Sequence, residues 1–277
     1  MSTVPSVKLN NGVEMPSLGF GVFQIAPEEV MGPVRVALEA GYRLIDTAWG
    51  YQNEEGVGRA VRESGIPRDQ LFITTKLTNS EHGYDRALRA FDASLARLQM
   101  DYMDLYLIHW PVPKAGLYVE TWRAFEKIYA DGRARSIGVS NFTVAHLQRL
   151  LDETGTVPAV NQVELHPRFA QPALREFHTL HGVATEAWAP IGQGKGLLDD
   201  PVIKDMAGRY GKSPARVVLR WHLQIGNIAI PKSVTPSRIR ENLDLFDFEL
   251  TPMDVQQLSE LAPEERIGPD PDTFDLR

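Results

Sequence analysis

The sequence feature that most constrains the fold is a regular alternation of short apolar runs with amphipathic stretches, repeated about eight times over roughly 250 residues. The apolar runs predict strands, and the stretches between them have the 3.6-residue spacing of helices. Parallel strands that are covered by helices read as continuous apolar runs, as these mostly do. The pattern therefore predicts an α/β fold, a closed (β/α)8 TIM barrel, with residues 1–277 forming a single domain because no linker interrupts the alternation.

The predicted elements follow directly from this alternation. Strands are expected at 19–23, 43–46, 71–76, 104–109, 134–139, 160–165, 183–189 and 227–230. Helices are expected at 27–40, 54–64, 85–98, 118–130, 144–153, 172–181, 202–210, 214–224, 236–243 and 251–261. Pro27, Glu28 and Glu29 are expected to open the first helix. Before the first strand, alternating apolar residues around Asn11-Gly12 predict a β-hairpin over 7–15 that caps one end of the barrel.

An open, doubly wound sheet has the same alternation of strands and helices and is the main alternative to the closed barrel. Such a sheet usually carries G-x-G-x-x-G after its first strand. Here Gly19 and Gly21 are followed by Gln24, and Gly56 and Gly58 by Val61, where the third glycine would stand. The missing pattern favours the closed barrel.

Composition excludes several classes of protein. The chain has no cysteine, which rules out disulfides, thiolate metal sites and cysteine nucleophiles and suits a reducing compartment. Its formal charge of 29 − 36 = −7 lacks the basic face of a nucleic-acid binder. We see no signal peptide and no apolar run of membrane-spanning length. We therefore expect a cytoplasmic protein without nucleic-acid or membrane partners, and a monomer, since no large apolar stripe is visible.

Three polar residues end predicted strands, and one follows in a loop. Asp46, Lys76 and His109 end the second, third and fourth strands, and Tyr51 lies five residues after Asp46. In a barrel these ends point at one axis, where catalytic residues gather. A lysine that Asp46 holds charged would stabilise the phenolate of Tyr51 and lower its pKa, while His109 orients a substrate oxygen. Each residue alone has a structural explanation; together they predict a proton donor for a carbonyl.

A proton donor of this kind needs a hydride source, which suggests a nicotinamide or a flavin. The last strand ends in Lys232, Ser233 and Val234, and a helix face follows with Arg238, Glu241 and Asn242. The cations and the helix N-terminus favour a phosphate, although a solvated basic cluster has the same appearance. The glycine-rich segment 192–196 could lie over a pyrophosphate, and Trp188 could stack on a nicotinamide ring, although most such tryptophans belong to a core.

Several motifs in register resemble the aldo-keto reductase family over nearly the whole chain. Residues 46–54 resemble its D-T-A-x-x-Y-x-N-E signature, and 104–111 contain a similar Leu-Ile-His-Trp-Pro run. Residues 230–242 resemble its cofactor signature, with Pro-Lys-Ser and a later Arg-x-x-Glu-Asn. The nearest resemblance is to the bacterial 2,5-diketo-D-gluconate reductase subgroup, because Trp188 is followed by a Gly-Gln-Gly-Lys loop at 192–195.

The resemblance implies a barrel that binds NADPH/NADP+ without a Rossmann domain, and a catalytic tetrad of Asp46, Tyr51, Lys76 and His109. It implies that Ser140, Asn141 and Gln162 hold the nicotinamide carboxamide and that Trp188 stacks on the ring. Further implied cofactor residues are Gly192, Gln193 and Gly194 at the pyrophosphate, Lys232, Ser233 and Arg238 at the 2′-phosphate, Glu241 and Asn242 at the adenine, and also Val234. Phe23, Trp49, His109, Trp110 and the tail near Phe274 are implied to line the substrate pocket.

The expected function is reduction of aldehydes or ketones, with diketones and keto-sugars as candidate substrates, by an NADP-dependent oxidoreductase with Tyr51 as the acid. The alternative is an NADPH-binding barrel that acts as a sensor or regulatory subunit without turnover. A metal-dependent hydrolase is a third reading. It would need ligands among Glu164, His166, His178 and His181, and we expect His178 and His181 to face solvent. Thr78 replaces the subgroup's frequent tryptophan, which should widen the pocket, and residues 267–277 match no subgroup pattern.

Overall fold

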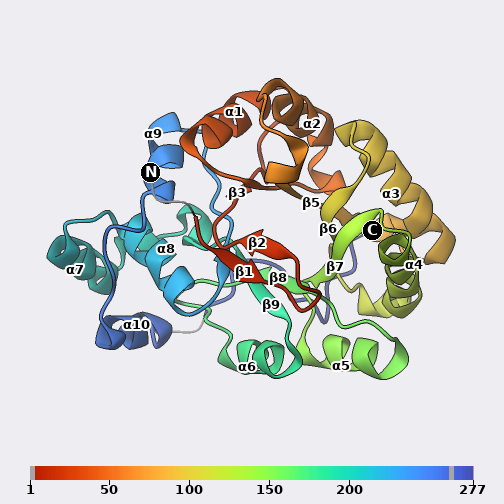
Figure 1. Ribbon diagram of the computed structural model, residues 1–277. Coiled ribbons are helices and arrows are strands. Elements are labelled where there is room, and N and C mark those ends of the chain that lie inside the picture. The colour runs from red at the N-terminus through yellow and green to blue at the C-terminus, as the bar shows by residue number, and fades with distance from the viewer. Residues whose placement is uncertain (1–3, 262–264, 277) are drawn as a thin grey trace.

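The computed structural model describes residues 4–261 and 265–276, and it contains a curled parallel sheet ringed by helices (Figure 1). Eight strands lie in the sheet in chain order, from β3 to β10. The first and last strands meet. The Gly19 amide donates to the Ala229 carbonyl at 2.9 Å, and the Ala229 amide donates to the Ser17 carbonyl at 3.0 Å. The closed (β/α)8 barrel predicted from the alternation is therefore confirmed.

The strands of the barrel are β3 (Phe20–Gly21), β4 (Leu44–Asp46), β5 (Phe72–Leu77), β6 (Met103–Ile108), β7 (Ala134–Ser140), β8 (Val160–Glu164), β9 (Ala184–Trp188) and β10 (Ile228–Ala229). The helices are α1 (Met31–Ala40), α2 (Glu54–Glu63), α3 (Tyr84–Leu98), α4 (Tyr118–Ala130), α5 (Val144–Glu153), α6 (Pro172–His181), α7 (Pro201–Tyr210), α8 (Pro214–Gln224), α9 (Pro236–Leu243) and α10 (Pro252–Ser259). Two short 3-10 helices matter below, η1 (Trp49–Tyr51) and η5 (Gly192–Gly194).

Most predicted elements agree with this structure to within a few residues at each end. The clearest difference is at the first helix, which begins at Met31 rather than at Pro27. The Glu29 amide donates to the Ala26 carbonyl at 3.0 Å, so the chain turns before the helix begins. This turn buries Val30 beside Gly56 of α2, where a methyl group on the glycine would overlap the valine. Packing between α1 and α2 therefore outweighs the favourable opening residues Pro27 and Glu28.

The predicted hairpin is present and closes the amino-terminal end of the strands (Figure 1). It comprises β1 (Ser6–Lys8) and β2 (Glu14–Pro16), and Gly12 in its turn has a φ of +87°, which favours glycine. Leu9 and Met15 from the hairpin segment are buried in an apolar cluster with Leu44 and Phe72, which lie at the starts of β4 and β5. This cluster forms the floor of the barrel.

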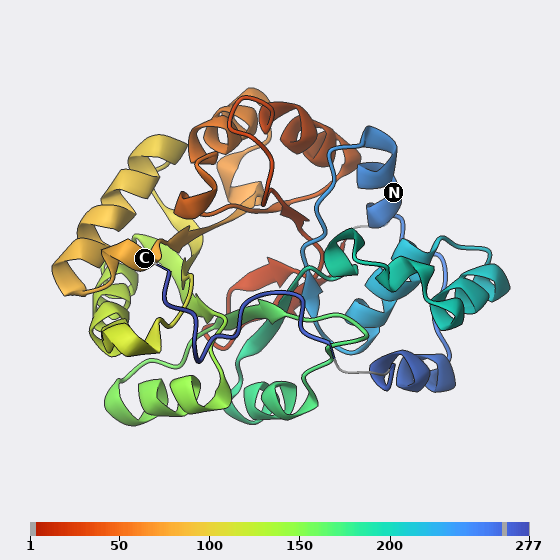
Figure 2. The same ribbon diagram turned by 180° about the vertical axis from the view of Figure 1, so that it is seen from behind.

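The opposite end of the barrel is crossed by the tail, residues 265–276, drawn in dark blue in Figure 2. The amides of Ile267 and Gly268 donate to the carboxylate of Glu164 at 2.6 and 2.8 Å. Further along, Phe274 packs on Trp110 with ring centroids 4.4 Å apart. The carbonyl of Leu276 accepts from Asn79 Nδ2 at 2.8 Å. The tail therefore borders the mouth formed by the carboxyl ends of the strands.

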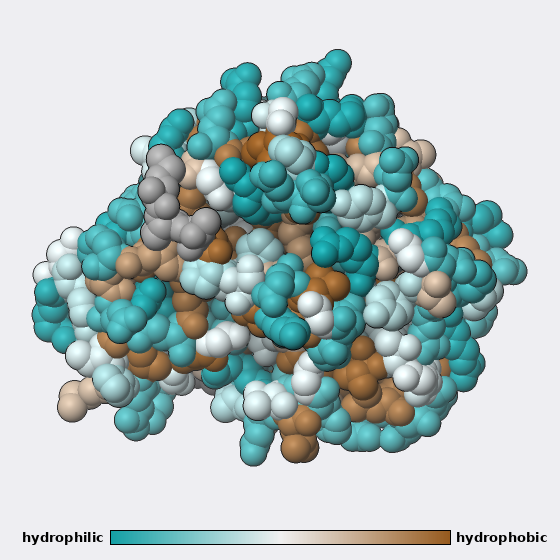
Figure 3. All heavy atoms as spheres, in the orientation of Figure 1, coloured by the Kyte–Doolittle hydropathy of each residue, from teal (hydrophilic) through white to brown (hydrophobic). Residues whose placement is uncertain are grey.

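The hairpin face of the molecule is largely hydrophilic, with apolar residues in several separate areas between polar ones (Figure 3). None of the helices in the described part of the chain is both long and apolar enough to cross a membrane.

Candidate active site

The four residues predicted as a catalytic group lie at or just after the ends of three neighbouring strands, at the mouth of the barrel. Asp46 is the last residue of β4, Lys76 is near the end of β5, and His109 directly follows β6. In the register, Asp46 pairs with Thr74, and Lys76 pairs with Leu107. Tyr51 ends η1, the short helix that rises from β4. The structure therefore brings together the four side chains that the sequence singled out.

Lys76 is the centre of this group. Its Nζ lies 2.6 Å from Asp46 Oδ1, 3.0 Å from the Thr47 carbonyl and 3.5 Å from the Tyr51 hydroxyl. Both Lys76 and Asp46 are buried. A buried ammonium needs such partners, because an unpaired charge in the barrel interior would be strongly unfavourable.

The electrostatics of Lys76 and Tyr51 differ in part from the prediction. Burial alone would lower the pKa of Lys76, but Asp46 and then Tyr51 outweigh it and raise that pKa, so the lysine stays charged. For Tyr51, burial raises the pKa more than Lys76 lowers it, and Asp46 raises it further. The expectation of a net lowered pKa for Tyr51 in the free protein is therefore wrong. The lysine acts in the expected direction, but desolvation is larger.

His109 lies against Tyr51, with ring centroids 5.7 Å apart and planes at 74°. Burial, followed by the charge of Lys76, lowers the pKa of His109 to about 3. The imidazole is therefore neutral at ordinary pH. A neutral ring can donate one hydrogen bond to a substrate oxygen without bringing a second cation to the site.

Four residues expected at the nicotinamide form one hydrogen-bonded cluster beside this group. The Asn141 amide donates to the His109 carbonyl at 2.9 Å and to Ser140 Oγ at 3.1 Å, and it accepts from Trp188 Nε1 at 2.7 Å. Ser140 Oγ donates to the Gln162 carbonyl at 2.8 Å. Asn141 adopts a φ of +62°, a conformation that asparagine tolerates better than most residues. The cluster links β7, β8 and β9 at the mouth.

Two buried carboxylates near these residues were not identified from the sequence as part of this site. Glu186, in β9, accepts from Gln162 Nε2 at 2.9 Å. Glu164 holds the tail and also lies 3.2 Å from His166 Nε2. A signal was available for Glu186, because it stands two residues before Trp188 and alternation places both side chains on the same face of the strand.

The residues expected at the phosphate surround the start of α9. Arg238 lies in its first turn and is exposed, as are Lys232 and Val234 just before it. Within the described residues, neither Lys232 nor Arg238 forms an ion pair with a carboxylate. Ser233 Oγ accepts from the Thr235 amide at 3.1 Å. Asn242 is buried and Glu241 is partly exposed on the same helix. Two unpaired cations at a helix N-terminus suit a phosphate group.

The glycine-rich segment after β9 contains η5, a single 3-10 turn whose backbone departs from regular helical geometry. Gly192, Gln193 and Gly194 all have positive φ, of 75°, 50° and 72°. Gly192 is buried, whereas Gln193 and Gly194 are exposed at the surface. Lys195, which follows, donates from Nζ to the Ile267 carbonyl of the tail at 3.1 Å. The segment is thus close to the tail as well as to Trp188.

The aromatic residues expected at the substrate also lie around the mouth. Phe23 is 44% exposed and contacts the Tyr51 ring at a centroid distance of 5.1 Å. Trp49 is in η1, and the guanidinium of Arg97 lies 5.6 Å above its ring. Trp110 is buried under Phe274 of the tail. Phe23 therefore borders Tyr51, and the tail covers Trp110, the residue that follows His109.

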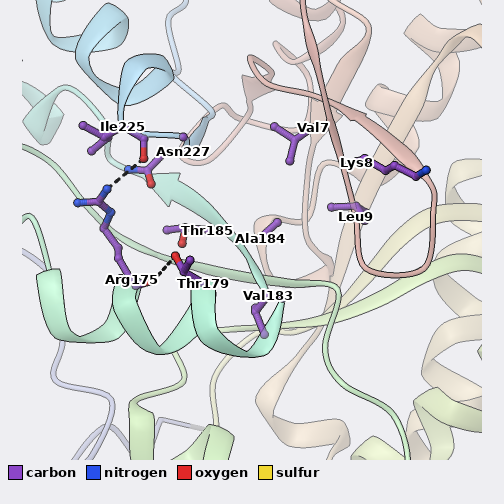
Figure 4. Close-up of a pocket in the computed structure, with 12 residues that line it drawn as sticks. Val7, Lys8, Leu9, Arg175, Thr179, Val183, Ala184, Thr185, Ile225 and Asn227 are labelled. Carbon is purple, nitrogen blue, oxygen red and sulfur yellow. Dashed lines mark hydrogen bonds between the residues drawn. The ribbon is translucent and has the colours of Figure 1, made fainter.

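A separate cavity of about 310 Å³ lies at the other end of the barrel, beside the hairpin (Figure 4). Arg175 projects along its edge and donates to the Ile225 carbonyl at 3.0 Å, at the end of α8. Thr179 and Asn227 also line it. No tetrad residue is among its lining residues, so it is distinct from the candidate active site.

The histidines considered as metal ligands have other roles. His178 is buried, not solvent-facing as expected, because its two ring nitrogens contact Asn161 at 2.9 Å and Thr185 at 2.8 Å. His181 is partly exposed. The residues that the structure describes contain no group of three or more histidine or acidic side chains placed to hold a metal ion.

Comparison with known proteins gives a consistent result. A model of the aldo/keto reductase family matches residues 17–263. The chain is 54% identical over 272 residues to an aldo-keto reductase of Mycolicibacterium smegmatis, covering 98% of both chains. It is 50% identical to the methylglyoxal reductase DkgA of Escherichia coli, covering 99% of both. A variant of Gox0644 in complex with NADPH has a TM-score of 0.95 and 46% identity, with 99% of this chain and 100% of that chain covered.

Proposed function

The chain belongs to the aldo/keto reductase family, and from that premise we propose that it reduces aldehydes and ketones to alcohols with NADPH as the hydride donor. The observation that carries the proposal is the contact of Lys76 Nζ with both Asp46 and the Tyr51 hydroxyl. This arrangement gives a phenol the neighbouring cation that a proton donor needs when a carbonyl oxygen gains negative charge.

The residues at the mouth fit NADPH. The nicotinamide, when bound, supplies the hydride. Ser140, Asn141 and Gln162 would hold its carboxamide and Trp188 would stack on its ring. Lys232, Ser233 and Arg238 would bind the 2′-phosphate. The further contacts proposed are Gly192, Gln193 and Gly194 at the pyrophosphate, and Val234, Glu241 and Asn242 toward the adenosine end. The exposed, unpaired Lys232 and Arg238 support this assignment, because a phosphate would supply the missing anion.

The proton steps are assigned to the tetrad. Tyr51 donates its hydroxyl proton to the substrate oxygen, and Lys76 stabilises the phenolate that remains. Asp46 keeps Lys76 charged and fixed in direction. His109 is neutral and directs the oxygen by a hydrogen bond. Phe23, Trp49, Trp110 and Phe274 enclose the rest of the substrate.

The substrate class is proposed as small carbonyl compounds, including dicarbonyls and keto-sugars. The methylglyoxal reductase among the relatives supports a small dicarbonyl. Thr78, partly exposed at the end of β5, leaves more room than a larger side chain would. We further propose that residues 1–277 act as one domain and that the protein is a monomer in the cytoplasm. Light scattering would test the monomeric state, and cell fractionation would test the location.

The test is steady-state oxidation of NADPH with a panel of aldehydes, diketones and keto-sugars, repeated with NADH. We expect turnover with at least one compound and a preference for NADPH. Tight NADPH binding without turnover of any compound would contradict the proposal and favour the sensor or regulatory role.

A further inference from the structure

Glu186 is a buried acid that the proposed chemistry does not yet use. It lies in the middle of β9 and is 0% exposed. Its Oε2 accepts from Gln162 at 2.9 Å, while its Oε1 has no hydrogen-bond partner within the described residues. Ile228, its register partner on β10, is apolar. Ionising a carboxyl group in such surroundings costs free energy, which points to a functional role for Glu186.

Gln162 connects Glu186 to the tetrad. Its Nε2 donates to Asp46 Oδ2 at 2.8 Å and to Glu186 Oε2 at 2.9 Å. An amide nitrogen carries two hydrogens, so these two bonds use both. The opposite orientation would place the amide oxygen against the carboxylate of Asp46 and is therefore disfavoured. Gln162 can then present only its Oε1 to a ligand, which suits the N–H of a carboxamide.

The charge around Glu186 comes from several elements. Asp46 faces it from β4, Lys76 from β5 and Tyr51 from η1, while Glu164 stands two residues beyond Gln162 on β8. Burial, followed by Asp46, raises the pKa of Glu186 to about 8, although Gln162 and Lys76 oppose this. At neutral pH Glu186 is therefore protonated, and the charges of Asp46 and Lys76 balance.

We propose that Glu186 is a positioning residue with two effects: it fixes the amide of Gln162 toward the nicotinamide carboxamide, and its ionisation adds a negative charge beside the Asp46–Lys76 pair. The inference rests on the proposed function. When Glu186 loses its proton to solvent, the added charge raises the pKa of both Tyr51 and Lys76. Tyr51 then keeps its proton to higher pH than it would beside a neutral residue.

The first test is the pH profile of Glu186→Gln, an isosteric neutral variant. Carbonyl reduction requires protonated Tyr51, and alcohol oxidation requires the phenolate. We expect the alkaline fall of reduction and the alkaline rise of oxidation both to move to lower pH in this variant. Asp104→Asn is the control, because Asp104 is an equally buried acid held by Arg68 and Arg135. It should change stability without moving either profile.

The second test does not depend on activity. In the protein without cofactor, carbon-13 NMR of labelled glutamate side chains should show one carboxyl that titrates near 8 and is missing from Glu186→Gln. Glu186→Leu, which also removes the acceptor for Gln162, should weaken NADPH binding about fivefold, the size of one orienting hydrogen bond. Glu186→Gln keeps the acceptor and should bind NADPH with less than half that loss.

Superimposed pH profiles of Glu186→Gln and the wild type, with a uniform change in rate, would overturn the inference while leaving carbonyl reduction intact. So would the absence of a high-pH glutamate titration. If the wild type turned over no carbonyl compound, the proposed function would fail, and the NMR and binding measurements would still decide the role of Glu186.

Discussion

Lys76 is the residue on which the proposed chemistry depends most, because one ammonium contacts both the carboxylate of Asp46 and the phenol of Tyr51. The lysine does not overcome the desolvation of Tyr51 in the free protein, where the net pKa is raised. The tyrosine is therefore stored in its protonated form, ready to act as an acid. What the lysine contributes is preferential stabilisation of the phenolate once the proton has left.

Replacing this proton donor gives the first prediction. Tyr51→Phe should lower turnover by roughly 10²- to 10⁴-fold, the usual contribution of a general acid. The dissociation constant of NADPH, measured by fluorescence quenching, should change little, since the hydroxyl contacts Lys76 and not the residues proposed to bind the cofactor. Turnover close to that of the wild type would exclude Tyr51 as the acid.

The helices differ in their roles: the start of α9 carries exposed cations, whereas the contact between α2 and α3 serves packing. The start of α9 carries Arg238 exposed and, within the described residues, without an ion-pair partner. The contact between α2 and α3 serves packing: a methyl group on Gly58 would overlap the carbonyl of Leu98. We have proposed that the start of α9 binds a phosphate, whereas the α2–α3 contact requires close approach of the two helices. Substitutions at Arg238 and Gly58 test the two roles separately.

Arg238→Ala should weaken NADPH far more than NADH, because only NADPH carries the 2′-phosphate that a guanidinium binds with two parallel hydrogen bonds. Dissociation constants for both cofactors, measured with the same variant, check this. The neighbouring Arg240→Ala is a matched control, since Arg240 donates a hydrogen bond to the Pro236 carbonyl of its own helix at 3.3 Å. Equal weakening of both cofactors by Arg238→Ala would show that this helix face does not read the phosphate.

Gly58→Ala should reduce the free energy of unfolding by about 1–3 kcal/mol, the usual cost of overpacking. The overlap is with backbone, which cannot rotate away. Gly208, inside α7, has no neighbouring atom within 4 Å of an added methyl group, so Gly208→Ala should stabilise the protein by about 0.5–1 kcal/mol. Denaturant titrations of the two variants measure their free energies of unfolding and test both predictions. A stable Gly58→Ala protein would mean that α2 can move away from α3.

Much of this element structure could be predicted from the sequence. Helices such as α4 and α6 have clear periodicity, and the strand-end rule located Asp46, Lys76 and His109. The start of α1 was missed because the burial of Val30 against Gly56 is a tertiary contact. The strand and face of Glu186 were readable from the sequence, but its role was not: that role comes from Gln162 and Asp46, which lie on other strands and become neighbours only when the barrel closes.

The whole molecule combines an apolar floor, a polar layer formed by Asp46, Lys76, Gln162 and Glu186, and a mouth crossed by the tail. The tail's position could not be read from the sequence, since it depends on Glu164 accepting two backbone amides from residues about a hundred positions later. The stability of the folded chain depends on pH through Glu186, because this residue keeps its proton in the folded chain under conditions in which the unfolded chain has released it.

This pH dependence of stability gives a prediction for the molecule as a whole. The pKa of Glu186 rises from 4.5 to about 8 on folding, so the stability that this group contributes is complete below about 4.5 and is lost as the pH rises through about 8. The Tm of the wild type should therefore fall relative to that of Glu186→Gln across this range and run parallel above it. A difference in Tm that does not vary with pH would contradict the raised pKa.

The hairpin floor has a consequence for the order of events. Met15 and Leu44 are fully buried beneath the polar layer and close the barrel at the hairpin end. The cofactor and the substrate must therefore both enter the barrel through its mouth. On the proposed placement, the nicotinamide stacks on Trp188 and the carbonyl compound binds on the side of the nicotinamide that faces the mouth. On the proposed cofactor placement we expect NADPH to bind before the carbonyl compound and NADP+ to leave after the alcohol, so that excess alcohol slows release of NADP+.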